Sequence, residues 1–259
     1  MHRSLRRFSR ILICAICVVV FSYLVLYMDS VHQRRKAERF ISELKVFPFA
    51  TAGFDETRDF ALRFGGHAVQ SVPQKPPFTC TVRDCAFVLR IKPSAVSVFN
   101  GESEPKRLLG LALLRLGIRP WGLTAVFRVH NGKLEESRID VGQFRQGGTG
   151  RYQGPIEISY SVRTARVWPS PFPPPELHNN YLLTRPSAIT GPPAEILIVH
   201  LLQSPDAPTT RAFDLRLDCL STILCGCRNF SELAPSPWAD YMTELNKPPQ
   251  HGPMVGSIE

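Results

Sequence analysis

The sequence predicts a mostly β protein in which an N-terminal transmembrane helix and short helices precede an antiparallel β-sandwich-like domain. Three observations support this prediction. Residues 11–28 form an apolar stretch without a charged side chain. From residue 78 onward, short runs of β-branched and aromatic residues alternate with turn residues, a pattern typical of strands. The 259 residues include 23 prolines, which interrupt helices and central strands and favour short strands with long connections.

The apolar stretch Ile11–Met28 is just long enough to cross a bilayer as a helix. Tyr23 and Tyr27 lie toward its far end, where aromatic rings favour the membrane interface. A cleaved signal peptide is the alternative interpretation, but its apolar core is usually shorter, and Tyr27-Met28-Asp29 offers no small-residue cleavage site. We therefore expect an uncleaved anchor that contacts the lipid bilayer through residues 11–28.

Charged residues predict the orientation of the anchor. Arginines precede it closely, at positions 3, 6, 7 and 10, so we expect a cytoplasmic N-terminus and an extracytoplasmic C-terminal domain. Basic residues also follow the anchor, and an inverted topology with a cytoplasmic domain is the alternative. The formal net charge is +9, but residues 1–45 hold nine Lys/Arg and three Asp/Glu and so contribute +6 of it. Because the rest of the chain is nearly balanced, we expect no nucleic-acid partner.

The predicted organisation is a basic N-terminal tail (1–10), the anchor (11–28), a juxtamembrane helical stalk (29–66), a β-rich extracytoplasmic domain (67–245) and a disordered tail (246–259). In the stalk, residues 30–45 predict a helix with one apolar face, made of Ala37, Phe40, Ile41 and Leu44. This face is expected to pack on the domain; a dimerisation seam is the alternative. A second short helix is expected near residues 55–64, ended by Gly65 and Gly66.

In the β-rich domain the clearest local signal is a hairpin. Residues 123–129 and 134–141 flank Asn131-Gly132, a pair that accepts the positive φ angles of a type I′ turn. Residues 212–219 alternate apolar and polar side chains, which predicts a strand with one face in water. Residues 108–116 fit a helix or a core strand, and their Leu and Ala content favours the helix. Further strands are expected at 78–92, 156–167 and 196–203.

The cysteines outside the anchor predict two disulfides. They form one pair, Cys80 and Cys85, and one group of three, Cys219, Cys225 and Cys227. Outside the cytoplasm disulfides are the default, and we expect Cys80–Cys85 and Cys219–Cys227, with Cys219–Cys225 as the close alternative. A straight strand would separate Cys80 from Cys85 by about 16 Å at 3.3 Å per residue, while a disulfide allows only about 7 Å between Cα atoms. The chain must therefore turn between them, and the apolar strand must begin near Cys85.

No pattern of known catalytic, phosphate-binding or metal-binding residues is legible. The sequence has no G-x-S-x-G, Walker A, G-x-G-x-x-G or H-E-x-x-H motif, and its cysteine spacing does not match a zinc site. We expect no catalytic residue, no cofactor and no metal. The leading hypothesis is a membrane-anchored, non-enzymatic envelope protein whose β-rich domain binds a protein or surface component. The alternatives are an extracytoplasmic enzyme whose site is assembled from scattered residues, and the inverted topology.

Overall fold

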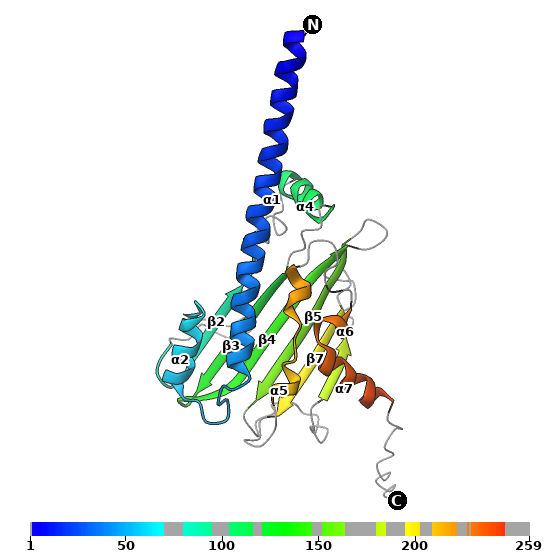
Figure 1. Cartoon of the computed structure of the whole chain (residues 1–259). Coiled ribbons are helices and arrows are strands. Elements are labelled where there is room, and N and C mark those ends of the chain that lie inside the picture. The colour runs from blue at the N-terminus through cyan, green and yellow to red at the C-terminus, as the bar shows by residue number, and fades with distance from the viewer. Residues whose placement is uncertain are drawn as a thin grey trace, which may run out of the picture.

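The centre of the molecule is a single mixed sheet. Its strands are β1 (His67–Val69), β2 (Cys85–Ile91), β3 (Trp121–His130), β4 (Lys133–Gln146), β5 (Tyr152–Arg163), β6 (Asn180–Thr184) and β7 (Glu195–Leu202). Their order across the sheet is β1-β2-β3-β4-β5-β7-β6, and every neighbouring pair is antiparallel except β5 and β7 (Figure 1). The computed structural model describes residues 2–69, 80–94, 104–115, 121–146, 152–163, 180–184, 195–202, 209–221, 227 and 229–246.

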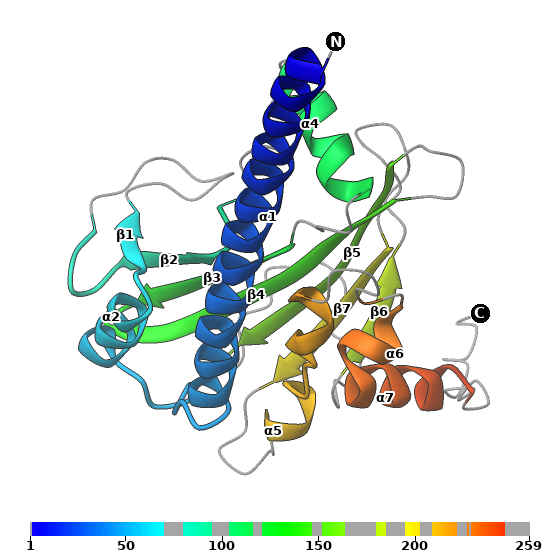
Figure 2. The same cartoon turned by 45° about the horizontal axis from the view of Figure 1, so that its top comes forward.

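Helices form the second layer. They are α1 (His2–Leu44), α2 (Phe54–Arg63), α4 (Glu104–Arg115), α5 (Thr209–Ala212), the 3-10 helix η1 (Leu217–Ser221), α6 (Phe230–Leu233) and α7 (Pro235–Leu245). The C-terminal part of α1 crosses one face of the sheet, and α2 and the C-terminal helices cover the same face on either side (Figures 1 and 2). The sheet, the apolar N-terminal helix and the short helices are confirmed, but the sheet is mixed and helical residues outnumber strand residues among those described, so a mostly β, antiparallel fold is not shown. A second sheet is not found among the described residues, so the sandwich is not shown.

Strand β3 explains why one face of the sheet needs a cover. Its residues alternate between buried side chains, from Trp121 to Val129, and half-buried ones. The buried set continues across the sheet by register: Leu89 lies opposite Ala125, Ala125 opposite Ile139, and Ile139 opposite Tyr160. Such alternation indicates that one face of the sheet is apolar and must be buried. It does not reveal whether helices or a second sheet cover that face. In this chain helices cover it.

Helix α1 changes its surroundings along its length. Its apolar window has a mean hydropathy of 2.3, none of it is buried, and the helix is long and apolar enough to cross a membrane. Val18 and Phe21, for example, are 65% and 69% exposed. Further along, the predicted apolar face packs on the sheet and α2, because its four residues are all at most 4% exposed: Ala37, Phe40, Ile41 and Leu44. The prediction that this face packs on the domain is confirmed.

The predicted hairpin is confirmed. Strands β3 and β4 pair directly, and between them Asn131 and Gly132 take φ angles of 53° and 76°. Both angles lie in the left-handed region that a type I′ turn needs. Predicted strands also match β2, β5 and β7, and residues 104–115 form the helix that their composition favours. The tail after residue 246, which is predicted to be disordered, lies outside the described residues.

The predicted strand at residues 212–219 is wrong. The chain forms α5, a bend and η1 there, and the Arg216 amide donates to the Leu233 carbonyl at 2.8 Å instead of to a neighbouring strand. The buried side chains are Phe213, Leu217 and Leu220. Their spacing of four and three residues suits a segment that lies across the buried face of the sheet. The alternation of apolar and polar residues in this segment is compatible with a strand and with the observed helical turns. Packing against the sheet favours the helical turns.

Two glycines end α2 as predicted, in different ways. Gly65 has φ +80°, and its amide donates to Leu62, while the Gly66 amide donates to Ala61. These two bonds form a Schellman motif. Gly66 has no positive φ. It is needed because a Cβ there would lie 2.8 Å from the Ala61 carbonyl oxygen.

The Gly66→Ala substitution is expected to lower the free energy of unfolding by about 1–3 kcal/mol, because the backbone of α2 would have to move. Chemical denaturation of the detergent-solubilised chain measures this loss. Gly122→Ala is the matched control, since a Cβ there would make only ordinary contacts, with the Lys92 Cβ at 3.7 Å and the Ile91 carbonyl oxygen at 3.8 Å. Equal stability of the two variants would contradict the close approach at Gly66.

Candidate functional site

Both cysteine pairs favoured by the sequence lie at bonding distance. Cys80 and Cys85 have Cα atoms 4.5 Å apart, and Cys219 and Cys227 have Cα atoms 5.0 Å apart. The chain turns between Cys80 and Cys85, since the Thr81 amide donates to the Asp84 carbonyl at 2.9 Å, and β2 begins at Cys85 as expected. Cys225 lies outside the described residues. The anchor cysteines, Cys14 and Cys17, are free and exposed.

On the side of the N-terminus, a seam of polar contacts fixes α1 to the domain directly after its apolar span. We call it the membrane-side seam; it consists of Asp29, Ser30 and Arg34 with their partners. The Ser94 amide donates to Asp29 Oδ2 at 2.6 Å, and the Trp121 indole Nε1 donates to Ser30 Oγ at 3.1 Å. Consecutive residues of α1 therefore hold two distant segments of the domain.

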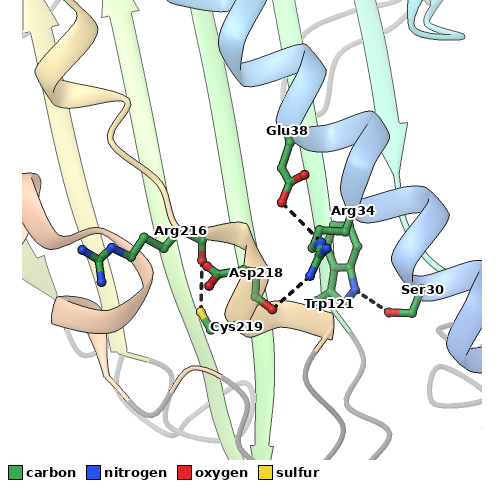
Figure 3. Close-up of polar contacts among 7 residues, drawn as sticks. All are labelled: Ser30, Arg34, Glu38, Trp121, Arg216, Asp218 and Cys219. Carbon is green, nitrogen blue, oxygen red and sulfur yellow. Dashed lines mark hydrogen bonds and ion pairs between the residues drawn. The ribbon is translucent and has the colours of Figure 1, made fainter.

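Arg34 extends the membrane-side seam to η1. Figure 3 shows its guanidinium between Glu38, one turn further along α1, and the carbonyl of Asp218. The Arg34 Nε lies 3.3 Å from Glu38 Oε1, and an Nη donates to Asp218 O at 3.5 Å. The Cys219 sulfur lies 3.1 Å from the Arg216 carbonyl (Figure 3). Because that sulfur is bonded to Cys227, it has no proton to donate and this is a close contact.

At the other end of the domain, an open groove of about 530 Å³ lies between the end of α1 and α2. We call it the distal groove. Its apolar surface includes the rings of Phe47 and Phe60, whose centroids are 4.5 Å apart. These rings join the groove to the core, because Phe60 also packs on the buried Phe127 at 5.7 Å. The groove is lined by Glu43, Val46, Phe47, Pro48, Glu56, Asp59, Phe60 and Arg63.

Charged side chains surround this apolar surface. Arg63 bridges the two helices through an ion pair with Glu43 at 2.7 Å, and Asp59 contacts Arg58 at 3.0 Å. Glu56 accepts the Gly53 amide at 2.9 Å as part of the capping of α2. The lining thus holds three carboxylates and one guanidinium. A ligand that offers an apolar group and a positive charge would complement it.

A comparison with known proteins found no matching family model, no matching curated protein and no matching solved structure. A functional assignment for this chain therefore rests on its own sequence and geometry. Within the part of the chain that the structure describes, no group of three or more His, Cys, Asp or Glu side chains could hold a metal ion.

The hairpin turn beside the first disulfide carries one further polar pair. His130 Nδ1 lies 2.5 Å from Asp84 Oδ1, and both side chains are about half exposed. The Gly132 amide donates to the Arg83 carbonyl at 2.8 Å, so the disulfide loop and the hairpin turn support each other. A His–Asp pair needs a nucleophile within reach to do chemistry. The hydroxyl of Thr81 lies beside Asp84, but it accepts the Asp84 amide at 3.1 Å as part of the turn, and we interpret the His–Asp pair as structural.

Sequence reasoning did not find the distal groove. Its side chains come from the last turn of α1, the connection after it and α2, and only the packing of the two helices brings them together. One feature of the sequence points to it: Phe47-Pro48-Phe49 places two large aromatic residues in a short connection between two predicted helices. Phe49 is buried, whereas Phe47 is only partly covered and forms part of the groove.

Proposed function

We propose that this chain is a membrane-anchored, non-enzymatic binding protein whose domain holds a segment of another protein in the distal groove. The observation that carries the proposal is the apolar, ring-lined groove with an acidic rim. Figure 1 shows the end of α1 and α2 at the end of the sheet opposite to the N-terminus. A groove there faces away from a bilayer that holds the first part of α1, so a partner in the adjoining compartment can reach it.

The chemistry of the groove indicates what the partner segment offers. Phe60 is buried, but the ring of Phe47 is only partly covered. Its exposed area gains from covering by another apolar side chain, at roughly 25 cal/mol per Å² of area removed from water. Carboxylates at the rim favour a basic residue beside that apolar group and disfavour an acidic one. We therefore propose a segment that combines a large apolar residue with a nearby Lys or Arg.

The same proposal places the domain outside the cytoplasm and the N-terminus inside. Disulfides persist in oxidising compartments, and the two cysteine pairs support such a compartment for the domain. The arginines that precede the apolar span support a cytoplasmic N-terminus.

Site-specific photo-crosslinking in the native membrane tests the groove. A photoreactive residue in place of Val46, which is 79% exposed and lines the groove, is expected to yield an adduct with another protein. The same residue in place of Leu62, which is 51% exposed on α2 but does not line the groove, is expected to yield none.

A charge reversal then tests whether the adduct depends on the acidic rim. Asp59→Lys, added to the Val46 probe, is expected to reduce the adduct severalfold, because it brings a positive charge against a basic partner. Asp55→Lys is the matched control: Asp55 also pairs with Arg58, at 2.9 Å, but does not line the groove. No adduct at Val46, or an adduct equally sensitive to both reversals, would contradict the proposal.

A further inference from the structure

Helix α4 belongs to a part of the chain that starts and ends at the membrane-side seam. Before α4 in sequence, the Ser94 amide is bonded to Asp29, and after α4 the Trp121 indole is bonded to Ser30. Asp29 and Ser30 directly follow Met28, the last residue of the apolar span. Ser94 and Trp121 therefore lie at the level at which α1 would leave a bilayer.

From that level, α4 lies toward the N-terminus of α1. Figure 1 shows it beyond the end of the sheet, and Figures 1 and 2 both show it beside α1. The α1 residues Tyr23, Leu26 and Tyr27 are partly covered, while Val25 and Met28 are 51% and 64% exposed. The partly covered residues share one side of α1, at the i, i+3, i+4 spacing of a helix face. Next to an apolar span, α4 occupies a place where a soluble domain would meet lipid.

The exposed side of α4 is apolar. Leu108 and Leu109 are 60% and 50% exposed. Together with the exposed Pro105 and Ala112 they follow the i, i+3, i+4, i+7 spacing of one helix face. Gly110 and Leu113, on the adjoining side of the helix, are buried. The sequence of the helix contains three basic residues and one acidic residue, a composition that suits anionic lipid headgroups.

We propose that α4 is an interfacial helix whose Pro105-Leu108-Leu109-Ala112 stripe lies in the bilayer leaflet from which α1 emerges. Lipid is the occupant because α4 lies beside α1 next to its exposed apolar span (Figures 1 and 2), and because Ser94 and Trp121, which flank α4 in sequence, are bonded to the residues that directly follow that span. The proposal rests on the insertion of α1 and is independent of the distal groove.

Two membrane contacts have a mechanical consequence for the domain. A single helix allows a domain to rotate and tilt about its anchor. With α4 in the interface as well, and with the seam of Asp29, Ser30 and Arg34 fixing the sheet to α1, the domain keeps one face toward the lipid. The end of α1 and α2 then point away from the bilayer.

Photo-crosslinking of the full chain in its native membrane, with mass analysis of the adducts, tests the lipid contact. A photoreactive residue at Leu108 or at Leu109 is expected to give lipid adducts, because both side chains are exposed and their replacement removes no buried contact. The same residue at Val18, which is 65% exposed within the apolar span, is the positive control. At Val46, at the opposite end of α1, no lipid adduct is expected.

Each outcome decides the proposal. Lipid adducts at Leu108 and Leu109 that match those at Val18 and are absent at Val46 support it. Adducts only with another protein or with a second copy of this chain would overturn it, as would the absence of lipid adducts at both positions while Val18 gives them. Absence of lipid adducts at Val18 as well would show that α1 is not inserted in the bilayer, and the proposal would fail with it. The protein adduct expected at Val46 is measured separately. The experiment therefore distinguishes failure of the proposed partner binding in the distal groove from failure of the proposed lipid contact of α4.

Discussion

Phe127→Ala is expected to lower the free energy of unfolding by about 3–5 kcal/mol. Phe127 is fully buried on β3 and is the ring on which the helices meet the sheet. Its centroid lies 5.7 Å from that of Phe60 on α2, 6.4 Å from that of Phe40 on α1 and 6.3 Å from that of Phe47. Alanine would leave a cavity among three rings and would also remove the edge-to-face contacts with Phe40 and Phe60.

Chemical denaturation of the full chain in detergent micelles measures this loss. Leu62→Ala is the control, because Leu62 is an apolar residue of α2 that is 51% exposed, and its change should stay within about 0.5 kcal/mol. A loss below about 1 kcal/mol for Phe127→Ala would mean that the helices do not pack on the sheet through this ring. Because Phe47 and Phe60 also line the distal groove, the variant is expected to weaken partner capture as well.

Local rules predicted the elements whose structure depends on neighbours in sequence. The apolar spacing of Ala37, Phe40 and Leu44 predicted the buried face of α1, since a helix places those positions together regardless of what they contact. Asn131-Gly132 predicted the hairpin because few other residues accept two positive φ angles in succession. The cysteine spacing required a turn before β2, and the chain makes that turn.

Features that depend on distant partners were not predicted. The alternation of buried and half-buried residues in β3 indicates that one face of the sheet is buried. Helices from both ends of the chain cover that face, and the described residues contain no second sheet. Residues 212–219 alternate like a strand but form part of this cover, because the ring of Phe213 packs on that of Tyr160, with centroids 4.8 Å apart, and Leu217 is buried in the same core. The distal groove likewise depends on how α2 packs against α1.

Replacing Cys219 and Cys227 together by serine is expected to lower the free energy of unfolding by about 2–3 kcal/mol, from the entropy of a short closed loop. The bridge joins residues that are eight positions apart. Its loop begins in η1, whose Leu217 and Leu220 are buried and whose Asp218 carbonyl accepts a bond from Arg34 of α1. Loss of the bridge is therefore expected to loosen the membrane-side seam. Denaturation with and without reductant measures the effect, because reductant should destabilise the parent more than the variant.

Non-reducing peptide mapping of protein from its native membrane determines whether these bridges form there. Trypsin cleaves after Arg83, so the Cys80–Cys85 bridge is expected to hold two tryptic peptides together until reductant is added. Cys219 and Cys227 share the tryptic peptide 217–228 with Cys225, and fragmentation between Cys225 and Cys227 identifies which of them is bonded. The structure favours Cys227, so Cys225 is expected to be labelled by a thiol reagent unless it pairs with another molecule. Free thiols at both Cys80 and Cys85 would contradict the first bridge. They would also remove a main support for an oxidising compartment around the domain, because thiols so close together would be expected to oxidise there.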